Sequence, residues 1–137
     1  MKIFVEGVVL PNKPLTNIEL LYAANELEIL NFRGVFQRDV LPKRAQKVEC
    51  NILNLDDSFG GGSHWTAWFK NNNEKLYFDS FAIRPPIELE DYLKSPIYYN
   101  TEEVQPRDQV FCGHLCLYVL KAQSKGKGLQ DIMNTLN

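Results

Sequence analysis

The stretch VQPRDQVFCGHLC, residues 104–116, joins a polar loop to the start of a buried helix. From its first cysteine onward, side chains recur at the i, i+3, i+4, i+7 spacing of a helix with one apolar face: Cys112, Leu115, Cys116 and Val119. Cys112 is therefore predicted to lie at the first turn of that helix. Unpaired backbone N–H groups and the helix dipole make such a position electropositive, which lowers the pKa of a thiol and favours the nucleophilic thiolate. A cysteine before a helix is more often structural, so the rest of the chain has to decide between the two roles.

The length and composition predict one globular domain. A chain of 137 residues is long enough to bury its own core, and we expect residues 1–137 to form a single domain. A net charge of −2 argues against a dedicated nucleic-acid-binding protein, which usually carries a strong basic excess. Three cysteines do not make the disulfide framework of a small secreted protein, so a reducing compartment is expected. No apolar run approaches the ~20 residues of a membrane span, and residues 1–7 show no signal peptide.

Local patterns predict an alternation of strands and helices. Thr16 and Glu19 form a capping box, which predicts a helix over residues 17–30. Further strands or extended segments are expected at residues 3–10, 34–42, 47–55, 64–70, 75–81 and 97–100, and further helices after Pro86, at 112–124 and at 129–136. The glycine-rich residues 56–63 lack the Gly-Lys-Ser/Thr ending of a phosphate-binding loop, so a rim loop is the preferred interpretation.

Residues 64–70 and 75–81 are predicted to form a hairpin around the asparagines at 71–73. If residues 71–72 make the turn, paired numbers sum to 143, and His64 lies directly opposite Asp79. If the turn comes one residue later, the two side chains share a face but lie diagonally; a turn with an odd number of residues would separate them. The opposite face carries the apolar residues of the expected core: Trp65, Ala67, Leu76 and Phe78.

These residues supply the parts of a cysteine hydrolase. Such an enzyme needs a thiolate, a histidine that later protonates the leaving amine, a group that orients this histidine, and donors for the developing oxyanion. Cys112, His64, Asp79 and Gln105 fit these roles in that order. We expect Asp79 to accept the Nδ1 proton of His64, and the amide of Gln105 and the backbone N–H of Cys112 to form the oxyanion hole.

The motifs also carry a family resemblance. The order His64-Trp65, then YFDSF at residues 77–81, then Gln105 seven residues before Cys112-Gly113, resembles the adenovirus-type (adenain-like) cysteine proteases, which share a clan with the ubiquitin-like-protein proteases. Residues 31–42 and 54–57 are similar to proteases of virophages and Maverick/Polinton-type elements. The resemblance implies an α+β, papain-like fold, in which helices flank a central mixed β-sheet and the nucleophile begins a buried helix. It also implies the catalytic set His64, Asp79, Gln105 and Cys112.

The function that the resemblance implies is a cysteine endopeptidase that cuts at small, Gly-containing sites and matures viral capsid precursors, in the virion and the infected cell. The alternatives are an isopeptidase acting on Gly-Gly tails of ubiquitin-like proteins, an acyltransferase with the same Cys-His pair, and an inactive binding module. The chain has Asp79 where the adenoviral enzyme has Glu, and it is shorter. A DNA or peptide activator like those of the adenoviral enzyme is therefore possible but not supported by the sequence, and we expect a weaker dependence on such activators. We expect a monomer with no metal, no cofactor and no membrane contact.

The remaining candidates have smaller roles. Trp65 and Gly113 are the predicted substrate contacts; strand alternation puts Trp65 in the core, whereas the resemblance implies a place beside the substrate groove, and both alternatives stay open. Cys50 and Cys116 are predicted to be buried, and His114 to be exposed. Cys112, His114 and Cys116 have no second ligand pair at zinc-finger spacing, so no zinc site is predicted.

Overall fold

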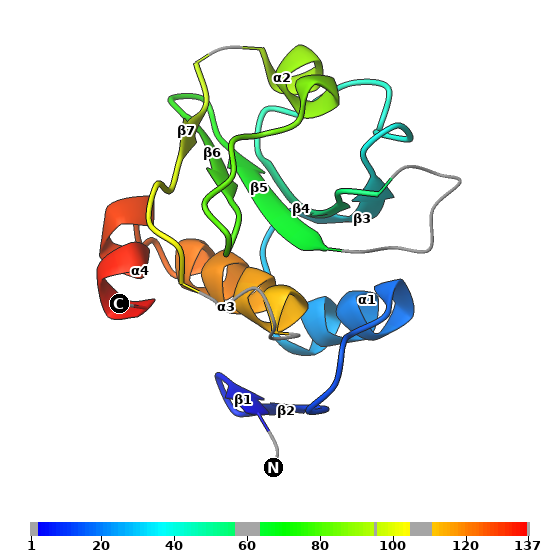
Figure 1. Ribbon diagram of the computed structural model, residues 1–137, viewed down its shortest axis with the longest axis vertical. Coiled ribbons are helices and arrows are strands. Elements are labelled where there is room, and N and C mark those ends of the chain that lie inside the picture. The colour runs from blue at the N-terminus through cyan, green and yellow to red at the C-terminus, as the bar shows by residue number, and fades with distance from the viewer. Residues whose placement is uncertain (1–2, 57–63, 95, 105–110, 137) are drawn as a thin grey trace.

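The computed structural model describes residues 3–56, 64–94, 96–104 and 111–136. At its centre is a sheet of five strands in the order β3-β4-β5-β6-β7 (Figure 1). These strands are β3 (Phe32–Gln37), β4 (Glu49–Asn54), β5 (Trp65–Lys70), β6 (Lys75–Phe78) and β7 (Tyr98–Tyr99). β3 pairs with β4 and β6 with β7 in parallel, whereas β4, β5 and β6 are antiparallel. The sheet is therefore mixed, as the family resemblance implied.

The hairpin between β5 and β6 adopts the later of the two turns considered above. Lys70 pairs with Lys75, and the Asn71 N–H donates to the carbonyl of Glu74. The side chain of Asn71 accepts the N–H groups of Asn73 and Glu74, each at 2.8 Å, which closes the turn on itself. Paired numbers therefore sum to 145, and this register puts residues 64 and 79 on one face in a diagonal relation.

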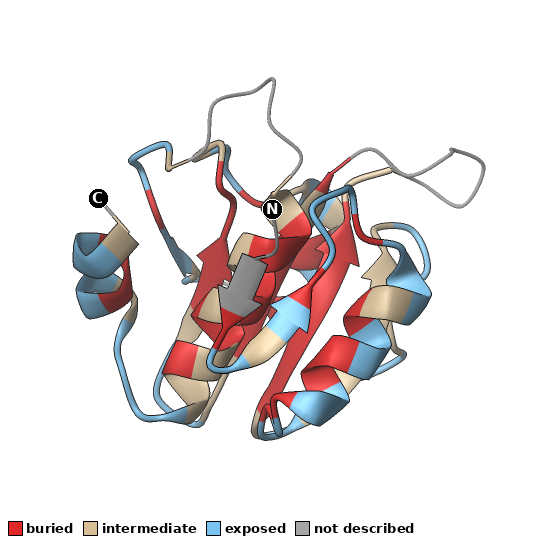
Figure 2. Ribbon diagram, turned by 90° about the horizontal axis from the view of Figure 1, so that it is seen from below, coloured by how far each residue is buried: buried red, intermediate tan, exposed pale blue. Residues whose placement is uncertain are grey.

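Helices cover both faces of the sheet (Figure 1). On one side lie α1 (Asn17–Glu26), α3 (Cys112–Ser124) and α4 (Leu129–Leu136), and on the other lies α2 (Ile87–Leu93). The larger core combines one face of the sheet with these three helices: Cys50, Ile52, Ala67, Phe69, Leu76 and Phe78 with Leu20, Leu117, Leu120 and Ile132. The smaller core lies under α2: Leu53, Trp68 and Tyr77 with Leu89 and Leu93. Figure 2 shows the buried residues concentrated in the sheet and on the helix sides that face it.

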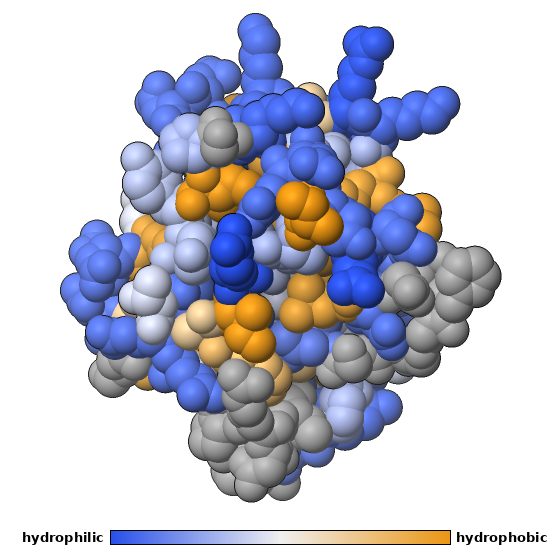
Figure 3. Space-filling model, turned by 45° about the horizontal axis from the view of Figure 1, so that its top comes forward, coloured by the Kyte–Doolittle hydropathy of each residue, from blue (hydrophilic) through white to orange (hydrophobic). Residues whose placement is uncertain are grey.

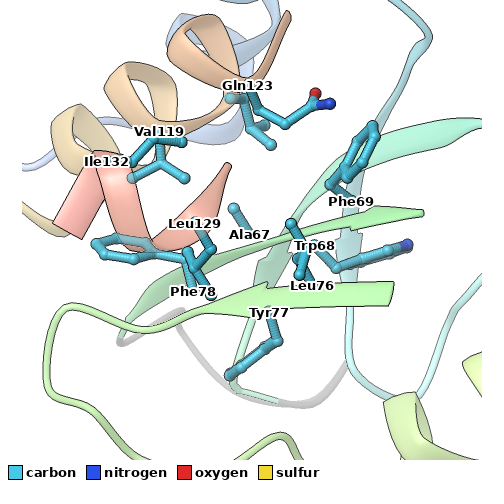
Figure 4. Close-up of a pocket in the computed structure, with 11 residues that line it drawn as sticks. Ala67, Trp68, Phe69, Leu76, Tyr77, Phe78, Val119, Gln123, Leu129 and Ile132 are labelled. Atoms are coloured by element: carbon cyan, nitrogen blue, oxygen red, sulfur yellow. The ribbon is translucent and has the colours of Figure 1, made fainter. Parts of the chain in front are cut away.

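The larger core is closely filled. Figure 4 shows Val119 and Ile132 of the helices above Ala67 and Phe78 of the sheet, while Tyr77 projects from the opposite face. The space left among these side chains is about 10 Å³, room for one water molecule at most. A substrate cannot bind inside this core, so a functional site has to lie at its rim.

A buried carboxylate organises the α2 side. Glu49 is fully buried and accepts hydrogen bonds from Trp68 Nε1 at 2.9 Å, from the Tyr92 hydroxyl at 2.9 Å and from Asn51 Nδ2 at 3.0 Å. Arg33 pairs with the same carboxylate at 3.0 Å. A buried charge is tolerated when it is paired and hydrogen-bonded in this way.

Several predicted boundaries differ from the structure. The segment predicted at residues 34–42 is β3 over Phe32–Gln37, and a turn with a hydrogen bond from the Val40 N–H to the Gln37 carbonyl ends it. The capping box of Thr16 and Glu19 begins α1 as expected, but the helix ends at Glu26 rather than residue 30, because Glu28 takes a left-handed backbone conformation with φ of 54°. Residues 3–10 form a separate hairpin of β1 (Ile3–Val5) and β2 (Val8–Leu10) instead of one strand. Its turn has positive φ at Glu6 and at Gly7.

The face over α2 is mostly hydrophilic, and its apolar side chains form separate spots between polar ones (Figure 3). Among the described helices, none is long and apolar enough to cross a membrane.

Candidate active site

Three elements bring the predicted residues to one end of the sheet. His64 directly precedes β5, Asp79 directly follows β6, and Cys112 is the first residue of α3. Because β5 and β6 are antiparallel, the start of one and the end of the other lie side by side. The apolar side of α3 packs on the same two strands, which brings its first turn toward them. His64, Asp79 and Cys112 therefore meet at one site because α3 and the sheet bury their apolar faces against each other.

His64 and Asp79 form a short hydrogen bond. His64 Nε2 lies 2.7 Å from Asp79 Oδ1, and the two side chains are 9% and 1% exposed. The ring nitrogen left for the Cys112 thiol is therefore Nδ1. The prediction that Asp79 holds Nδ1 is wrong, because the ring enters from its position before β5 with Nε2 toward the carboxylate.

Asp79 is itself held from several sides. Its Oδ1 also accepts the backbone N–H of Phe81 at 2.8 Å, and its backbone binds the side chain of Asn100. Its Oδ2 is buried and has no hydrogen-bond partner within the part of the chain that the structure describes. The carboxylate therefore directs one oxygen at the imidazole and keeps it there.

Phe81 covers the imidazole. Its ring stacks on that of His64 with centroids 4.1 Å apart and planes 5° from parallel. An aromatic face favours a neighbouring cation, so this stacking suits a protonated His64 while it excludes water from one side of the ring. No role for Phe81 was predicted from the sequence. The signal was present in the second hairpin register, in which residues 64 and 81 are paired positions.

The site favours a charged pair of cysteine and histidine. Burial alone lowers the pKa of His64, but its hydrogen bonds to Asp79 and Cys112 and their negative charges raise that pKa to about 9. Burial alone raises the pKa of Cys112, but the hydrogen bond to His64, the positive charge on the imidazole and the backbone N–H groups of Trp65 and Gly113 bring that pKa below its ordinary value. Both changes stabilise a thiolate next to an imidazolium.

The first turn of α3 adds to this effect. Phe111, the residue before the helix, makes no side-chain capping hydrogen bond, and Cys112 follows it as the first helical residue. The free N–H groups of the turn and the helix dipole favour negative charge at this position. The electropositive helix start predicted from the sequence is therefore present.

Gly113 and Trp65, the predicted substrate contacts, pack against each other. A Cβ atom on Gly113 would lie 3.2 Å from Trp65 Cδ1 and 3.2 Å from Leu20 Cδ2. Trp65 is half-buried, and its Nε1 donates to the carbonyl of Leu15 at 2.9 Å. The space beside Gly113 is thus filled by side chains of the protein, and contact of either residue with substrate stays a prediction.

The remaining candidates are placed as follows. His114 is buried, not exposed as predicted, because its Nε2 bonds the carbonyl of Pro11 at 2.7 Å, where the N-terminal segment covers the helix start. Burial lowers the pKa of His114, which favours the neutral imidazole. Cys50 and Cys116 are buried as expected, and burial raises the pKa of both thiols. Gln105 lies outside the described residues.

Among those that are described, no group of three or more His, Cys, Asp or Glu side chains could hold a metal ion.

Comparison with known proteins shows the fold. No protein-family model matches this sequence, and no curated protein matches it. Among solved structures, the crystal structure of the ASFV pS273R protease is similar, with a TM-score of 0.57 and 18% sequence identity. The similarity covers 91% of this chain, which spans 63% of the length of that protease. The predicted α+β, papain-like class is therefore confirmed: the chain has a protease fold, with Cys112 at the start of a buried helix.

Proposed function

We propose that the protein is a cysteine endopeptidase with Cys112 as its nucleophile. The observation that carries this proposal is the position of one imidazole: His64 is held by Asp79 at 2.7 Å through Nε2, and it interacts with the Cys112 thiol so that the pKa of His64 is raised and that of Cys112 is lowered. This is the relation of nucleophile, base and orienting group that cysteine hydrolysis requires.

The chemistry follows from these positions. The Cys112 thiolate attacks the carbonyl carbon of the peptide bond, and the negative charge moves to the carbonyl oxygen. When this tetrahedral intermediate collapses, the C–N bond breaks, and the proton on His64 Nδ1 passes to the leaving amine. The product is a thioester on Cys112. His64, now neutral, takes a proton from a water molecule that attacks the thioester, which releases the carboxylic acid and restores the ion pair.

Two features lower the barrier to this reaction. Asp79 keeps the imidazole in the tautomer and orientation that the proton transfers need. The backbone N–H of Cys112, with the side-chain amide of Gln105, would donate to the oxyanion. The role of Gln105 rests on its position seven residues before Cys112.

The proposed substrates are viral capsid precursors cut at small, Gly-containing sites, in the virion and the infected cell. This part of the proposal rests on the resemblance of the His64-Trp65 and Gln105-to-Gly113 motifs to adenovirus-type proteases. A protease that acts on Gly-Gly tails would use the same residues. The two functions differ in substrate, so one experiment can separate them.

The test uses the purified protein with two substrates: a viral capsid precursor that contains Gly-rich cleavage sites, and a ubiquitin-like protein whose C-terminal Gly-Gly is fused to a second polypeptide. New termini are identified by mass spectrometry. Cleavage of the precursor at Gly-containing sites, abolished in Cys112→Ala, supports the proposal. Cleavage of the fusion alone indicates the isopeptidase, and cleavage that survives in Cys112→Ala overturns the assignment of the nucleophile.

A further inference from the structure

A buried asparagine holds the backbone of Asp79. Asn100 follows β7 directly and is 5% exposed. Its Nδ2–H donates to the Asp79 carbonyl at 2.7 Å, and its Oδ1 accepts the Asp79 N–H at 3.0 Å. Both polar groups of one side-chain amide are therefore used on the main chain of one residue.

This contact continues the sheet where its strand pairing stops. β6 and β7 pair in parallel through Leu76 with Tyr98 and Tyr77 with Tyr99, and the ladder ends there. One step further along, the amide of Asn100 replaces the missing backbone pairing to residue 79. The Val104 N–H then donates to the Ser80 carbonyl at 2.9 Å, so residues 100–104 lie along residues 79–80.

Asp79 is therefore held through both its main chain and its side chain. Its backbone is bound by Asn100, and its carboxylate is bound by His64 and Phe81. A short, charge-assisted hydrogen bond such as the one at 2.7 Å to His64 depends strongly on distance and direction. A backbone shift at Asp79 would change this bond directly, because the side chain has only two rotatable bonds between the main chain and Oδ1.

We propose that Asn100 is a positioning residue for the Cys112–His64 ion pair, acting through Asp79. Asn100 is too deeply buried to bind substrate, so its loss should affect the rate of reaction rather than substrate affinity. The kinetic part of this inference rests on the proposed function. The reactivity of the Cys112 thiol does not depend on that function, because it can be measured without a substrate.

Asn100→Asp is the most informative change. It keeps the size of the side chain and the oxygen that accepts the Asp79 N–H, but it replaces the donor facing the Asp79 carbonyl with an acceptor oxygen. Asn100→Ala removes both contacts with Asp79 and also the longer hydrogen bond from Nδ2 to the Glu102 carbonyl at 3.3 Å. In each variant we expect a displaced Asp79 carboxylate, a weaker bond to His64 and less thiolate at Cys112 at neutral pH.

Asn51→Ala provides the matched control. Asn51 is also a fully buried amide on the sheet, but it donates to Glu49 on the α2 side, and its strand partners are Gly34 and Trp68 rather than residues of the candidate site. Its loss should lower thermal stability without changing the reactivity of Cys112. A difference between the two positions therefore separates positioning from general destabilisation.

The experiment measures alkylation of each cysteine by iodoacetamide against pH, with peptide mass spectrometry as the readout. We expect the Cys112 profile to move upward by about one pH unit in both Asn100 variants, a tenfold change in the thiolate equilibrium. Cys50 and Cys116 should stay protected, and Asn51→Ala should match the wild type. On a cleavable substrate, kcat should fall about 10- to 100-fold with KM unchanged. In an Asp79→Asn background, Asn100→Ala should add little further effect.

Two results would overturn the proposal. In the first, the Cys112 profile of Asn100→Asp stays at its wild-type position. In the second, Cys112 loses reactivity only together with exposure of Cys50 and Cys116, which would show that Asn100 maintains the fold as a whole. If no substrate is cleaved but the alkylation profile shifts as expected, the proposed function fails while the positioning role stands.

Discussion

His64 Nε2 lies 2.7 Å from Asp79 Oδ1 although the two residues are diagonal, not opposite, in the hairpin register. The contact is possible because β5 begins just after His64 and β6 ends just before Asp79, so both residues leave the regular ladder. Because Asp79 lies outside the regular strand pairing, its Oδ1 can contact the His64 ring and also accept the backbone N–H of Phe81.

Asp79→Asn should weaken catalysis and keep the fold. The amide retains the shape of the carboxylate but loses the negative charge that raises the pKa of His64, so less imidazolium is available to protonate the leaving amine. We expect kcat/KM to fall by about 10²- to 10⁴-fold. The measurement is kcat/KM against pH, in which the basic limb of the variant should move to lower pH. An unchanged basic limb would show that Asp79 does not control the charge on His64.

Phe81→Leu should separate stacking from simple burial. Leucine keeps most of the apolar volume but removes the aromatic face that lies on the imidazole at 4.1 Å. Aromatic pairs contribute about 0.5–1.5 kcal/mol beyond burial, so we expect kcat to fall about two- to tenfold. Phe81→Tyr is the control, because it keeps the ring and should retain most of the activity. Equal losses in both variants would argue against a role for the stacked ring.

Much of this arrangement could be predicted from local sequence. The helical spacing that starts at Cys112 predicts residues 112–124, which is where α3 lies. A two-residue turn within the asparagines at 71–73 predicts His64 and Asp79 on one face, and the observed register has such a turn. The acidic and apolar residues after Pro86 likewise predict α2. These features depend on contacts within a few residues, which a single sequence records directly.

The parts that could not be predicted depend on distant segments. Asn100 meets Asp79 because β7 adds in parallel to β6 after the α2 crossover, and no local pattern reports that pairing. His114 is buried because Pro11 reaches the helix start from 103 positions away. Which nitrogen of His64 faces Asp79 depends on how the ring enters the site, and the spacing of residues carries no information on it.

Gly113→Ala should strain the start of α3. The added Cβ would lie 3.2 Å from both Trp65 and Leu20, closer than ordinary packing allows. Overpacking of this kind costs about 1–3 kcal/mol in the free energy of unfolding. We expect a lower melting temperature and a lower kcat, since Cys112 is the adjacent residue. Gly128→Ala is the matched control, because a Cβ there would meet no atom within 4 Å and should leave both quantities near the wild type.

Gln105→Ala tests the predicted oxyanion donor. An oxyanion donor acts mainly when charge develops on the carbonyl oxygen, so its loss should lower kcat by about 10²- to 10³-fold with little change in KM. Gln109, which lies in the same stretch but three residues before Cys112, is the control. Its substitution by alanine should lower kcat by less than about tenfold. The reverse outcome would mean that the donor is assigned to the wrong glutamine.

The pH dependence of the ion pair follows from two opposite pKa shifts. The raised pKa of His64 keeps the imidazolium at every pH below about 9 and loses it as the pH rises through that value. The lowered pKa of Cys112 keeps the thiolate at every pH above that lowered value. The reactive pair therefore exists between the two values, and activity should form a bell with its basic limb near pH 9.

The most direct test of this account is the alkylation rate of each cysteine against pH in the wild type and in His64→Ala. We predict that Cys112 in the wild type reacts rapidly at neutral pH while Cys50 and Cys116, buried and with raised pKa values, stay unreactive. In His64→Ala, rapid reaction at Cys112 should require a markedly higher pH. Equal reactivity of the three thiols, or a Cys112 profile that does not change when His64 is removed, would contradict the thiolate–imidazolium pair and the proposed nucleophile.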